Sequence, residues 1–272
     1  MPLLEYHQSH IHYEFRSHPK GSRGTLVLLH GFLEDSRMWK QLTPYFEHVG
    51  SILMIDLPGH GKTSSFGYEH TMDFMAGCVR AVLDELDLTD CVLLGHSMGG
   101  YAALAFTDLY PNYLTGLGLF FSTPEADSPE RLEMRLRAAE LVKKNKNAFI
   151  RAAIPQLFDV DVRNAFKDEI SSQIQESLTL DTQGILASIM GMSARPNRTG
   201  ILHRPPSPLM PDRIAVFAGK KDTVIPFHGV QDWWNTESVG FRHLSDHGHM
   251  GHISDSKGCG MAIAAWWEKL LT

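Results

Sequence analysis

Residues 95–100 read Gly-His-Ser-Met-Gly-Gly and place one serine, Ser97, between closely spaced glycines. A short apolar run precedes this motif and a helix-like segment follows it. A Gly-x-Ser-x-Gly turn between a strand and a helix strains the backbone of the serine and exposes its hydroxyl. Side chains at Gly95 and Gly99 would collide across so sharp a turn. The spacing therefore predicts a nucleophile at Ser97; the alternative is a glycine-rich turn whose serine has no chemical role.

A serine hydroxyl is a weak nucleophile and needs a base that is itself oriented by an acid. Asp222 follows an expected strand at 213–218, and His249 follows the last expected strand at 239–244. Both side chains would then lie at the carboxyl ends of strands, as Ser97 does. The sequence therefore predicts a Ser-His-Asp triad.

Each partner of the serine has alternatives nearby. His247 and His252 could serve as the base, and Glu125 or Asp127, after the preceding strand, could serve as the acid. The three histidines of 246–252 could instead bind a metal, because imidazole is a common zinc ligand. We find no carboxylate or cysteine that joins them, and we expect no metal and no cofactor.

The elements around these residues alternate between strands and helices, which favours a mostly parallel sheet covered on both faces. The apolar runs and helical spacings predict strands at 10–15, 25–29, 52–55, 114–121, 213–218 and 239–244, and helices at 36–46 (capped by Ser36), 71–86, 227–236 and 253–271.

Residues 124–203 break this alternation. They contain no convincing strand and four helical segments, at 129–144, 148–158, 162–178 and 182–194. A stretch of about 80 residues is much longer than an ordinary connection. We therefore expect an α/β core formed by 1–123 and 204–272, with 124–203 inserted as a helical cap.

Five motifs in this order resemble the α/β-hydrolase superfamily over nearly the full chain. They are Leu29-His-Gly-Phe-Leu33, Asp56-Leu-Pro-Gly-His-Gly61, the serine motif of 95–100, the segment 219–226 and Gly248-His-Met250. The resemblance implies the α/β-hydrolase fold and the chain order Ser, Asp, His. It selects His249 as the base, because a Gly-His pair opens the loop after the last strand in this family. It also explains Gly61-Lys62-Thr63 better than a phosphate-binding loop does, since Asp56 stands where such a loop needs glycine.

The resemblance also assigns the supporting residues. The backbone amides of Phe32 and Met98 would form the oxyanion hole, and losing one such donor typically costs ~10²–10³ in rate. Leu33 and His96, beside these positions, are expected to border the substrate. A serine nucleophile separates this chain from the dehalogenase and epoxide hydrolase branches, which typically use aspartate.

The predicted reaction is hydrolysis of carboxylic esters with small to medium acyl groups. Hydrolysis of a carbon–carbon bond or acyl transfer by the same triad is one alternative, and a non-catalytic ligand-binding receptor is another. The segment after Ser122 is similar to caps of carboxylesterase and enol-lactonase relatives. Within this cap, apolar side chains could line the pocket, with simple packing as the alternative: Met134, Met190 and Met192. Arginines of the cap could bind a substrate carboxylate, with exposure to solvent as the alternative: Arg131, Arg135, Arg137 and Arg151.

Composition limits the possible partners. The 272 residues are 43% hydrophobic and carry a formal net charge of −6, which argues against general affinity for nucleic acid or anionic membranes. No apolar run approaches the roughly 20 residues of a membrane span. Three cysteines and no apparent signal peptide favour a cytoplasmic protein. The expected partner is a small-molecule ester; the oligomeric state cannot be predicted.

Overall fold

The computed structural model describes residues 3–19, 21 and 24–272. Its strands are β1 (Leu3–Tyr6), β2 (Ser9–Arg16), β3 (Thr25–Leu29), β4 (Ser51–Ile55), β5 (Cys91–His96), β6 (Leu114–Phe120), β7 (Ile214–Gly219) and β8 (Val239–Ser245). Its α-helices are α1 (Met72–Glu85), α2 (Met98–Leu109), α3 (Pro129–Ala153), α4 (Lys167–Leu178), α5 (Thr182–Ser193), α6 (Thr199–His203), α7 (Phe227–Trp234), α8 (Gly251–Ser254) and α9 (Ser256–Leu270). Short 3-10 helices lie at Ser36–Gln41, Thr43–Tyr45, Pro111–Tyr113 and Ile154–Leu157.

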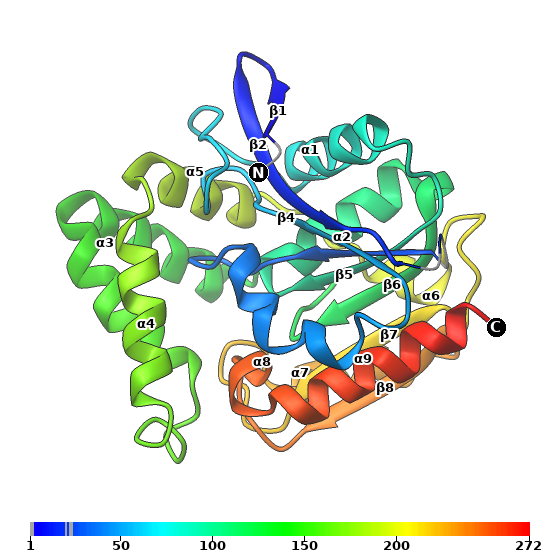
Figure 1. Ribbon diagram of the computed structural model, residues 1–272. Coiled ribbons are helices and arrows are strands. Elements are labelled where there is room, and N and C mark those ends of the chain that lie inside the picture. Colours follow the sequence, from blue (N-terminus) through cyan, green and yellow to red (C-terminus); the bar gives the residue numbers. More distant parts are fainter. Residues whose placement is uncertain (1–2, 20, 22–23) are drawn as a thin grey trace.

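The described strands form one eight-stranded sheet in the order β1-β2-β4-β3-β5-β6-β7-β8 (Figure 1). The pairs β1–β2 and β2–β4 are antiparallel, and every other pair is parallel. The strand that ends at the serine motif, β5, lies near the middle of the sheet between β3 and β6. A site at its carboxyl end can therefore receive side chains from loops on both sides.

Helices cover both faces of this sheet. Val27 and Leu29 of β3 belong to one apolar cluster with α1, α2 and α7, whereas Leu26 and Leu28 belong to another with α9. Figure 1 shows α9 on the opposite side of the sheet from α1 and α2. Because both faces are covered, β3, β4, β5 and β7 are buried at every residue, as expected for central parallel strands.

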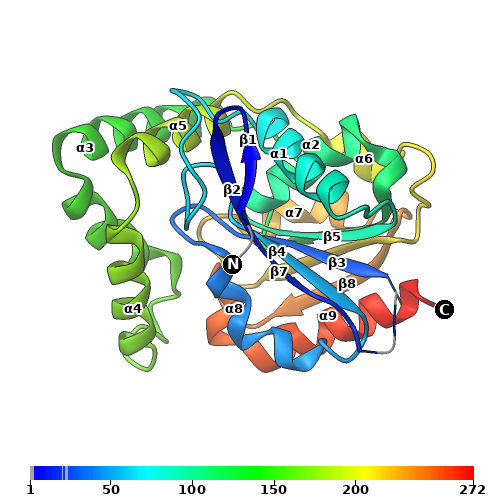
Figure 2. The same ribbon diagram turned by 45° about the horizontal axis from the view of Figure 1, so that its top comes forward.

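Three further helices form a third apolar cluster beside the sheet. The chain between β6 and β7 contains α3, α4 and α5, which Figures 1 and 2 both place to one side of the strands. Ile150 of α3 and Ile185 of α5 pack in one cluster with Leu33 and Met250, from loops that follow β3 and β8. These helices therefore cover the loops that carry the expected catalytic residues.

The structure confirms the expected alternation of strands and helices and corrects several details. The predicted helix 36–46 consists of two 3-10 helices, and Asp35, rather than Ser36, caps the first of them. Helix α4 begins only at Lys167, although the spacing predicted helix from 162. The C-terminal helix is divided at Asp255, where the backbone leaves the helical region. Strand β1 and helix α6 were not predicted; both are short.

The predicted helices 129–144 and 148–158 appear as one kinked helix and a 3-10 turn. Asn145 interrupts α3 with φ −160° and ψ 86°, and its side chain accepts a hydrogen bond from the backbone N–H of Ala148. The predicted break between two helical segments is therefore present. The short amide side chain restarts the helix in the manner of an N-cap.

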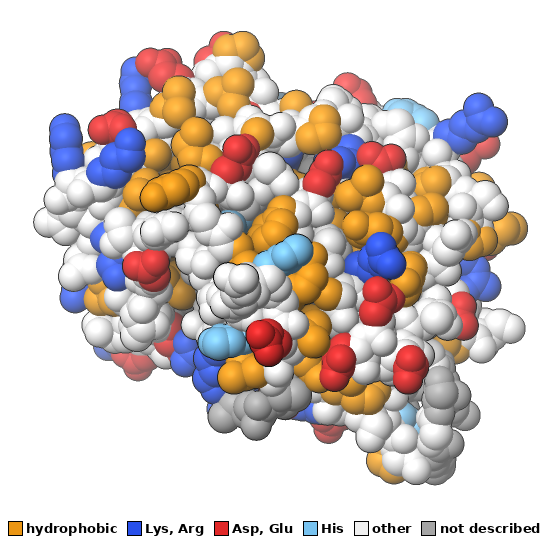
Figure 3. All heavy atoms as spheres, turned by 90° about the horizontal axis from the view of Figure 1, so that it is seen from above, with side chains coloured by type: hydrophobic (Ala, Val, Ile, Leu, Met, Phe, Trp, Pro, Cys, Tyr) orange, Lys and Arg blue, Asp and Glu red, His pale blue; other side chains and the backbone are white. Residues whose placement is uncertain are grey.

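The face of the molecule seen from above carries charges of both signs. Figure 3 shows one face on which acidic and basic side chains are interspersed, with no broad patch of one sign. In the described part of the chain, no helix is both long enough and apolar enough to cross a bilayer.

Candidate active site

Ser97 occupies the sharp turn between β5 and α2. Its backbone has φ 49° and ψ −112°, a strained conformation for a residue with a side chain. A Cβ atom at Gly95 would lie 2.2 Å from the carbonyl oxygen of Gly99, and one at Gly99 would lie 2.4 Å from the carbonyl oxygen of Leu29. Glycine is therefore required at both positions for the strand and helix to approach this closely.

The hydroxyl of Ser97 faces an imidazole that is held by a carboxylate. His249 Nε2 lies 2.9 Å from Ser97 Oγ, and His249 Nδ1 lies 2.8 Å from Asp222 Oδ2. The other carboxylate oxygen of Asp222 accepts hydrogen bonds of 2.8 Å from the backbone N–H groups of Val224 and Ile225. An ionised Asp222 orients the proton of His249 onto Nδ1 and leaves Nε2 free to accept one from the serine.

The alternative histidines and acids have other partners. His252 pairs with Glu34, and His247 Nδ1 lies 3.7 Å from Asp159. Asp127 is ion-paired with arginines. Among the described hydrogen bonds and ion pairs, none joins these groups or Glu125 to Ser97 or His249. The structure therefore brings together the three residues that the sequence favoured.

The two expected oxyanion amides come from different loops. Met98 is the first residue of α2, and the first amides of a helix have no acceptor within it. Phe32 follows β3 and lines the same pocket as Ser97. The next residue, Leu33, has a φ of 63°, and its carbonyl oxygen accepts hydrogen bonds from Gln173 and Ser177 of α4. The loop after β3 is therefore attached to the helices that cover it.

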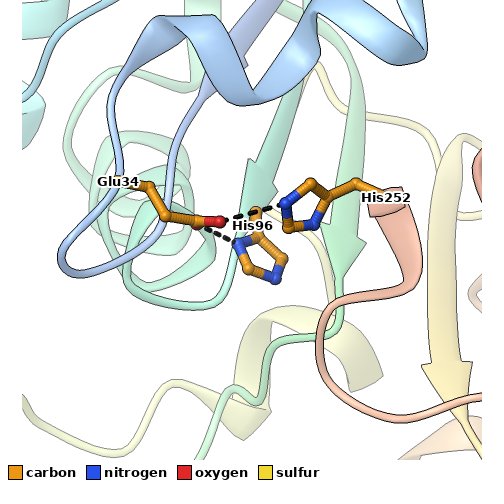
Figure 4. Close-up of side chains that lie close together, drawn as sticks. All are labelled: Glu34, His96 and His252. Atoms are coloured by element: carbon orange, nitrogen blue, oxygen red, sulfur yellow. Dashed lines mark hydrogen bonds and ion pairs between the residues drawn. The ribbon is translucent and has the colours of Figure 1, made fainter. Parts of the chain in front are cut away.

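The same loop contains a buried carboxylate, Glu34, which was not predicted from the sequence. Its Oε2 lies 2.7 Å from His96 Nδ1 and accepts a hydrogen bond of 3.0 Å from the backbone N–H of Gly31. Its Oε1 lies 3.1 Å from His252 Nε2. Figure 4 shows Glu34 approached by both imidazoles, one from β5 and one from α8. We call Glu34, His96 and His252 the Glu34 cluster; it joins three of the segments around Ser97.

The partners of His96 define its charge. Its Nε2 lies 3.1 Å from the carbonyl oxygen of His249, and its Nδ1 faces the carboxylate of Glu34. Both neighbours are acceptors, so both ring nitrogens of His96 must carry a proton. Burial opposes this charge, but the Glu34 carboxylate outweighs burial and raises the pKa of His96. His96 lines the pocket, as expected, yet it is almost fully buried, and its ring nitrogens face Glu34 and the carbonyl oxygen of His249.

The cluster also corrects the expectation that no carboxylate joins the C-terminal histidines. Burial would raise the pKa of Glu34, but His96 and His252 hold it well below its ordinary value. Burial lowers the pKa of His252, and the pull of Glu34 only partly compensates. A single carboxylate therefore faces two imidazoles whose pKa values are shifted in opposite directions. In the sequence, only the short distance of Glu34 from the His30-Gly31 motif could have pointed to a place near Ser97.

Two groups of described side chains have ligand atoms within 4.8 Å of one another and could converge on a metal: Glu34, His96 and His252, and His243, Asp255 and Cys259. In the first group, each oxygen of Glu34 already meets one imidazole nitrogen at a hydrogen-bonding distance. In the second, the Asp255 carboxylate accepts hydrogen bonds from Ser245 and from the backbone of Gly258. Hydrogen bonds thus engage Glu34 Oε2 in the first group and Asp255 in the second, whereas Glu34 Oε1, both ring nitrogens of His252 and His243 Nε2 have no hydrogen-bond partner among the described residues.

A pocket of about 380 Å³ opens beside Ser97 and His249. The residues from α3 to α5 that border it include Arg131, Met134, Arg135, Ala138, Phe149, Ile189 and Met192. Met134 and Met192 thus line the pocket as expected, whereas Met190, Arg137 and Arg151 are not among its lining residues. The surface is mainly apolar, with polar groups near the serine and on α3.

The two arginines of the pocket share a second buried carboxylate. Asp127, whose side chain has no exposed surface, pairs with Arg131, Arg135 and Arg195. Burial would raise the pKa of Asp127, but Arg195 and Arg135 lower it. Arg195 also lies over the ring of Tyr101, 4.0 Å from its centroid. We call Asp127 and its three arginines the Asp127 cluster; its members are Asp127, Arg131, Arg135 and Arg195.

The family comparison covers most of the chain. The model described as "Alpha/beta hydrolase family" matches residues 26–259. An esterase from Thermogutta terrifontis, solved with malate bound, has a TM-score of 0.86 and 27% identity, covering 97% of this chain and 95% of that one. The enol-lactonase from Burkholderia xenovorans LB400 has a TM-score of 0.87 at 17% identity, covering 97% and 99%, which concerns the fold alone.

Curated relatives match over shorter stretches. The acetyltransferase component of the acetoin cleaving system from Pseudomonas putida is 35% identical over 141 residues, 51% of this chain and 36% of that protein. A 2-hydroxy-6-oxononadienedioate/2-hydroxy-6-oxononatrienedioate hydrolase from Escherichia coli is 35% identical over 92 residues, 32% of each chain. The chain thus spans about a third of the length of these relatives.

Proposed function

The chain belongs to the alpha/beta hydrolase family, and from this premise we propose that it is a serine hydrolase that cleaves carboxylic esters through an acyl-enzyme. The observation that carries the proposal is the continuous contact from Ser97 Oγ to His249 Nε2 and from His249 Nδ1 to Asp222. The likeness to the Thermogutta terrifontis esterase supports the choice of ester substrates.

In the first step Ser97 attacks the ester carbonyl carbon while His249 takes the proton of the hydroxyl. Asp222 holds the imidazole and stabilises the positive charge that develops on it. The negative charge moves to the carbonyl oxygen, toward the amides of Phe32 and Met98. When the carbonyl re-forms, the bond to the alcohol breaks, and His249 returns its proton to the leaving oxygen.

The second step reverses these roles with water. His249 removes a proton from a water molecule, which attacks the acyl-enzyme carbonyl and forms a second tetrahedral intermediate at the same oxyanion hole. Collapse of this intermediate releases the carboxylic acid, and the proton on His249 returns to Ser97. All groups needed for the cycle belong to the protein, the ester and water.

A mostly apolar pocket of about 380 Å³ suits an ester with a small to medium acyl group. We further propose that 124–203 form the cap over this pocket and that 1–123 and 204–272 form the core. A cytoplasmic location is part of the same proposal, and the free, buried state of Cys78, Cys91 and Cys259 supports it.

Hydrolysis of p-nitrophenyl acetate and butyrate tests the proposal. We expect turnover by the wild type and a loss of at least ~10³-fold in kcat for Ser97→Ala and for His249→Ala. Ser193→Ala is a matched control, because its hydroxyl bonds only to the carbonyl of Ile189 in its own helix. Folding of each variant is checked by circular dichroism.

Other results would point to one of the alternative functions. Cleavage of vinylogous diketones without ester cleavage would replace the proposal by carbon–carbon bond hydrolysis. Transfer of the acyl group to an added alcohol in preference to water would indicate an acyltransferase. Ligand binding by a folded wild type that turns over no substrate would indicate a receptor.

A further inference from the structure

One face of α3 carries two cations into the pocket beside Ser97. Arg131, Met134, Arg135 and Ala138 are spaced by three or four residues and all line the pocket. Residues at this spacing lie on one face of a helix. Arg137, one position off this face, is 72% exposed and pairs instead with Glu133. Of the arginines on α3, only Arg131 and Arg135 therefore line the pocket.

These arginines are not neutralised by their own surroundings. Three guanidinium groups of the Asp127 cluster share one carboxylate within ion-pair distance in the described part of the chain. The cluster therefore carries two positive charges in excess. Glu125 interacts with Arg195, the arginine that does not line the pocket. Glu34 also borders the pocket, but His96 and His252 occupy its two oxygens.

Hydrogen-bonding capacity remains on both pocket arginines. Arg131 Nη1 donates to the carbonyl oxygen of Val224 at 2.6 Å, and its Nε lies 3.4 Å from Asp127. Arg135 Nη1 has the sulfur of Met192 as its acceptor, at 3.4 Å. A thioether is a weak acceptor, and a guanidinium has five N–H donors. A carboxylate entering the pocket would replace the weak contact with a charge-assisted one.

From this charge excess we infer that the pocket selects esters that carry a second, ionised carboxylate, bound by Arg135 and Arg131. The inference rests on the proposed ester hydrolysis and specifies its substrate class. Asp127 fixes the guanidinium groups in place before substrate arrives, which lowers the entropic cost of binding. The remaining apolar lining would contact the chain between the carboxylate and the ester.

Matched esters test the inference on the unmodified protein. Monomethyl adipate is compared with methyl hexanoate, which places the carboxylate in the acyl part. The anion 4-acetoxybutanoate is compared with butyl acetate, which places it in the alcohol part. Hydrogen bonds to charged groups typically contribute about 1.5–3 kcal/mol, so we expect at least a roughly tenfold higher kcat/KM for the anion in one of the two pairs.

Charge-removing variants locate the binding group. Arg135→Gln should lower the anion-to-neutral ratio of kcat/KM by about tenfold, and Arg135→Lys should retain part of the preference because it keeps the charge. Asp127 retains Arg195 and Arg131 as partners in both variants. Arg137→Gln removes the same charge from the outer side of α3 and should leave the ratio unchanged.

These experiments distinguish a failure of the inferred carboxylate preference from a failure of the proposed ester hydrolysis. Equal kcat/KM within both ester pairs, in a protein that hydrolyses them, overturns the inference and leaves ester hydrolysis intact. A preference that survives in Arg135→Gln and Arg131→Gln alike also overturns it. Turnover of none of the four esters or of p-nitrophenyl butyrate by folded protein overturns the proposed function itself.

Discussion

Two buried carboxylates, Glu34 at the pocket and Asp127 behind its arginines, are compensated in different ways. Glu34 faces two histidines whose pKa values are shifted in opposite directions, so the charge of its cluster depends on pH. Asp127 faces three arginines and is overcompensated. In both clusters, cationic neighbours hold the carboxyl pKa below its ordinary value despite burial.

The difference shows how the partner determines what a buried carboxylate can do. A histidine can lose its proton near neutral pH, whereas an arginine stays charged. The Glu34 cluster is therefore a balanced, pH-dependent link between the loops around Ser97. The Asp127 cluster is a permanent source of positive charge in the pocket.

Removal of the carboxylate from the Glu34 cluster should have the largest effect. In Glu34→Gln the buried charge of His96 loses its counter-charge, and breaking a buried pair in this way costs about 3–5 kcal/mol. We expect the free energy of unfolding, measured with urea, to fall by that amount. The kcat/KM for p-nitrophenyl butyrate should fall as well, because a His96 that loses its charge can no longer donate from both ring nitrogens, to residue 34 and to the carbonyl oxygen of His249.

Glu133→Gln serves as the control, since it removes the same charge from an exposed pair. A loss below about 1 kcal/mol in Glu34→Gln would mean that the Glu34 cluster contributes no more to stability than an exposed ion pair does. That result would contradict the proposed difference between the Glu34 cluster and the Asp127 cluster.

Asp127→Asn should come second. The substitution leaves three arginines without a counter-charge, but Arg131 and Arg135 have side chains that are 34% and 16% exposed at the pocket. Because water can partly screen these two, we expect a loss of about 2–3 kcal/mol, below the range for a fully buried pair. Urea denaturation of this variant beside Glu34→Gln measures the difference. A larger loss than in Glu34→Gln would reverse the order.

The clusters should also differ in alkaline solution. The raised pKa of His96 means that its stabilising contribution is complete below the ordinary value of 6.5 and is lost as the pH rises through the folded-state pKa. The lowered pKa of Asp127 acts in the opposite window: its contribution is complete above 3.8 and is lost as the pH falls. Only the Glu34 cluster should therefore weaken above neutral pH.

Urea denaturation between about pH 6.5 and about pH 9.5 measures this loss of stability. The free energy of unfolding should fall by about 1.4 kcal/mol for each unit by which the pKa of His96 is raised. His96→Gln should show a smaller fall than the wild type, whereas Asp127→Asn should keep the same fall. Identical slopes in the wild type and His96→Gln would refute the assignment of a charged His96.

Arg137→Gln should have the smallest effect. Its guanidinium lies on the same helix as the pocket arginines, but both partners of its ion pair are mostly exposed. Such pairs contribute about 0.5 kcal/mol or less within a helix. A thermal or urea shift larger than about 1 kcal/mol would show that charge on α3 matters regardless of the face that carries it.

Local patterns were sufficient to predict the parallel strands and the three side chains that meet at the end of β5. The strand at Thr25–Leu29 is a continuous apolar run, and the structure gives it those limits. Ser97, Asp222 and His249 each follow a strand, so the sheet alone brings them to one edge. Their mutual distances agree with the predicted triad.

The compensation of charge was not predictable in the same way. His96 and Glu34 are 62 residues apart, and only the packed loops show that they meet. The arginines of α3 were equivalent in the sequence, yet the pitch of the helix turns Arg131 and Arg135 toward the pocket and Arg137 toward solvent. Short elements such as β1 and α6 were missed, because so few residues carry little periodic signal.

The most direct test of the account is to locate the adduct of a fluorophosphonate probe by mass spectrometry of the intact and digested protein. We expect one adduct per chain on the peptide that contains Ser97, no adduct in Ser97→Ala, and normal labelling in the control Ser193→Ala. An adduct on another serine, or no adduct in folded wild type, would contradict the assignment of Ser97 as the activated nucleophile.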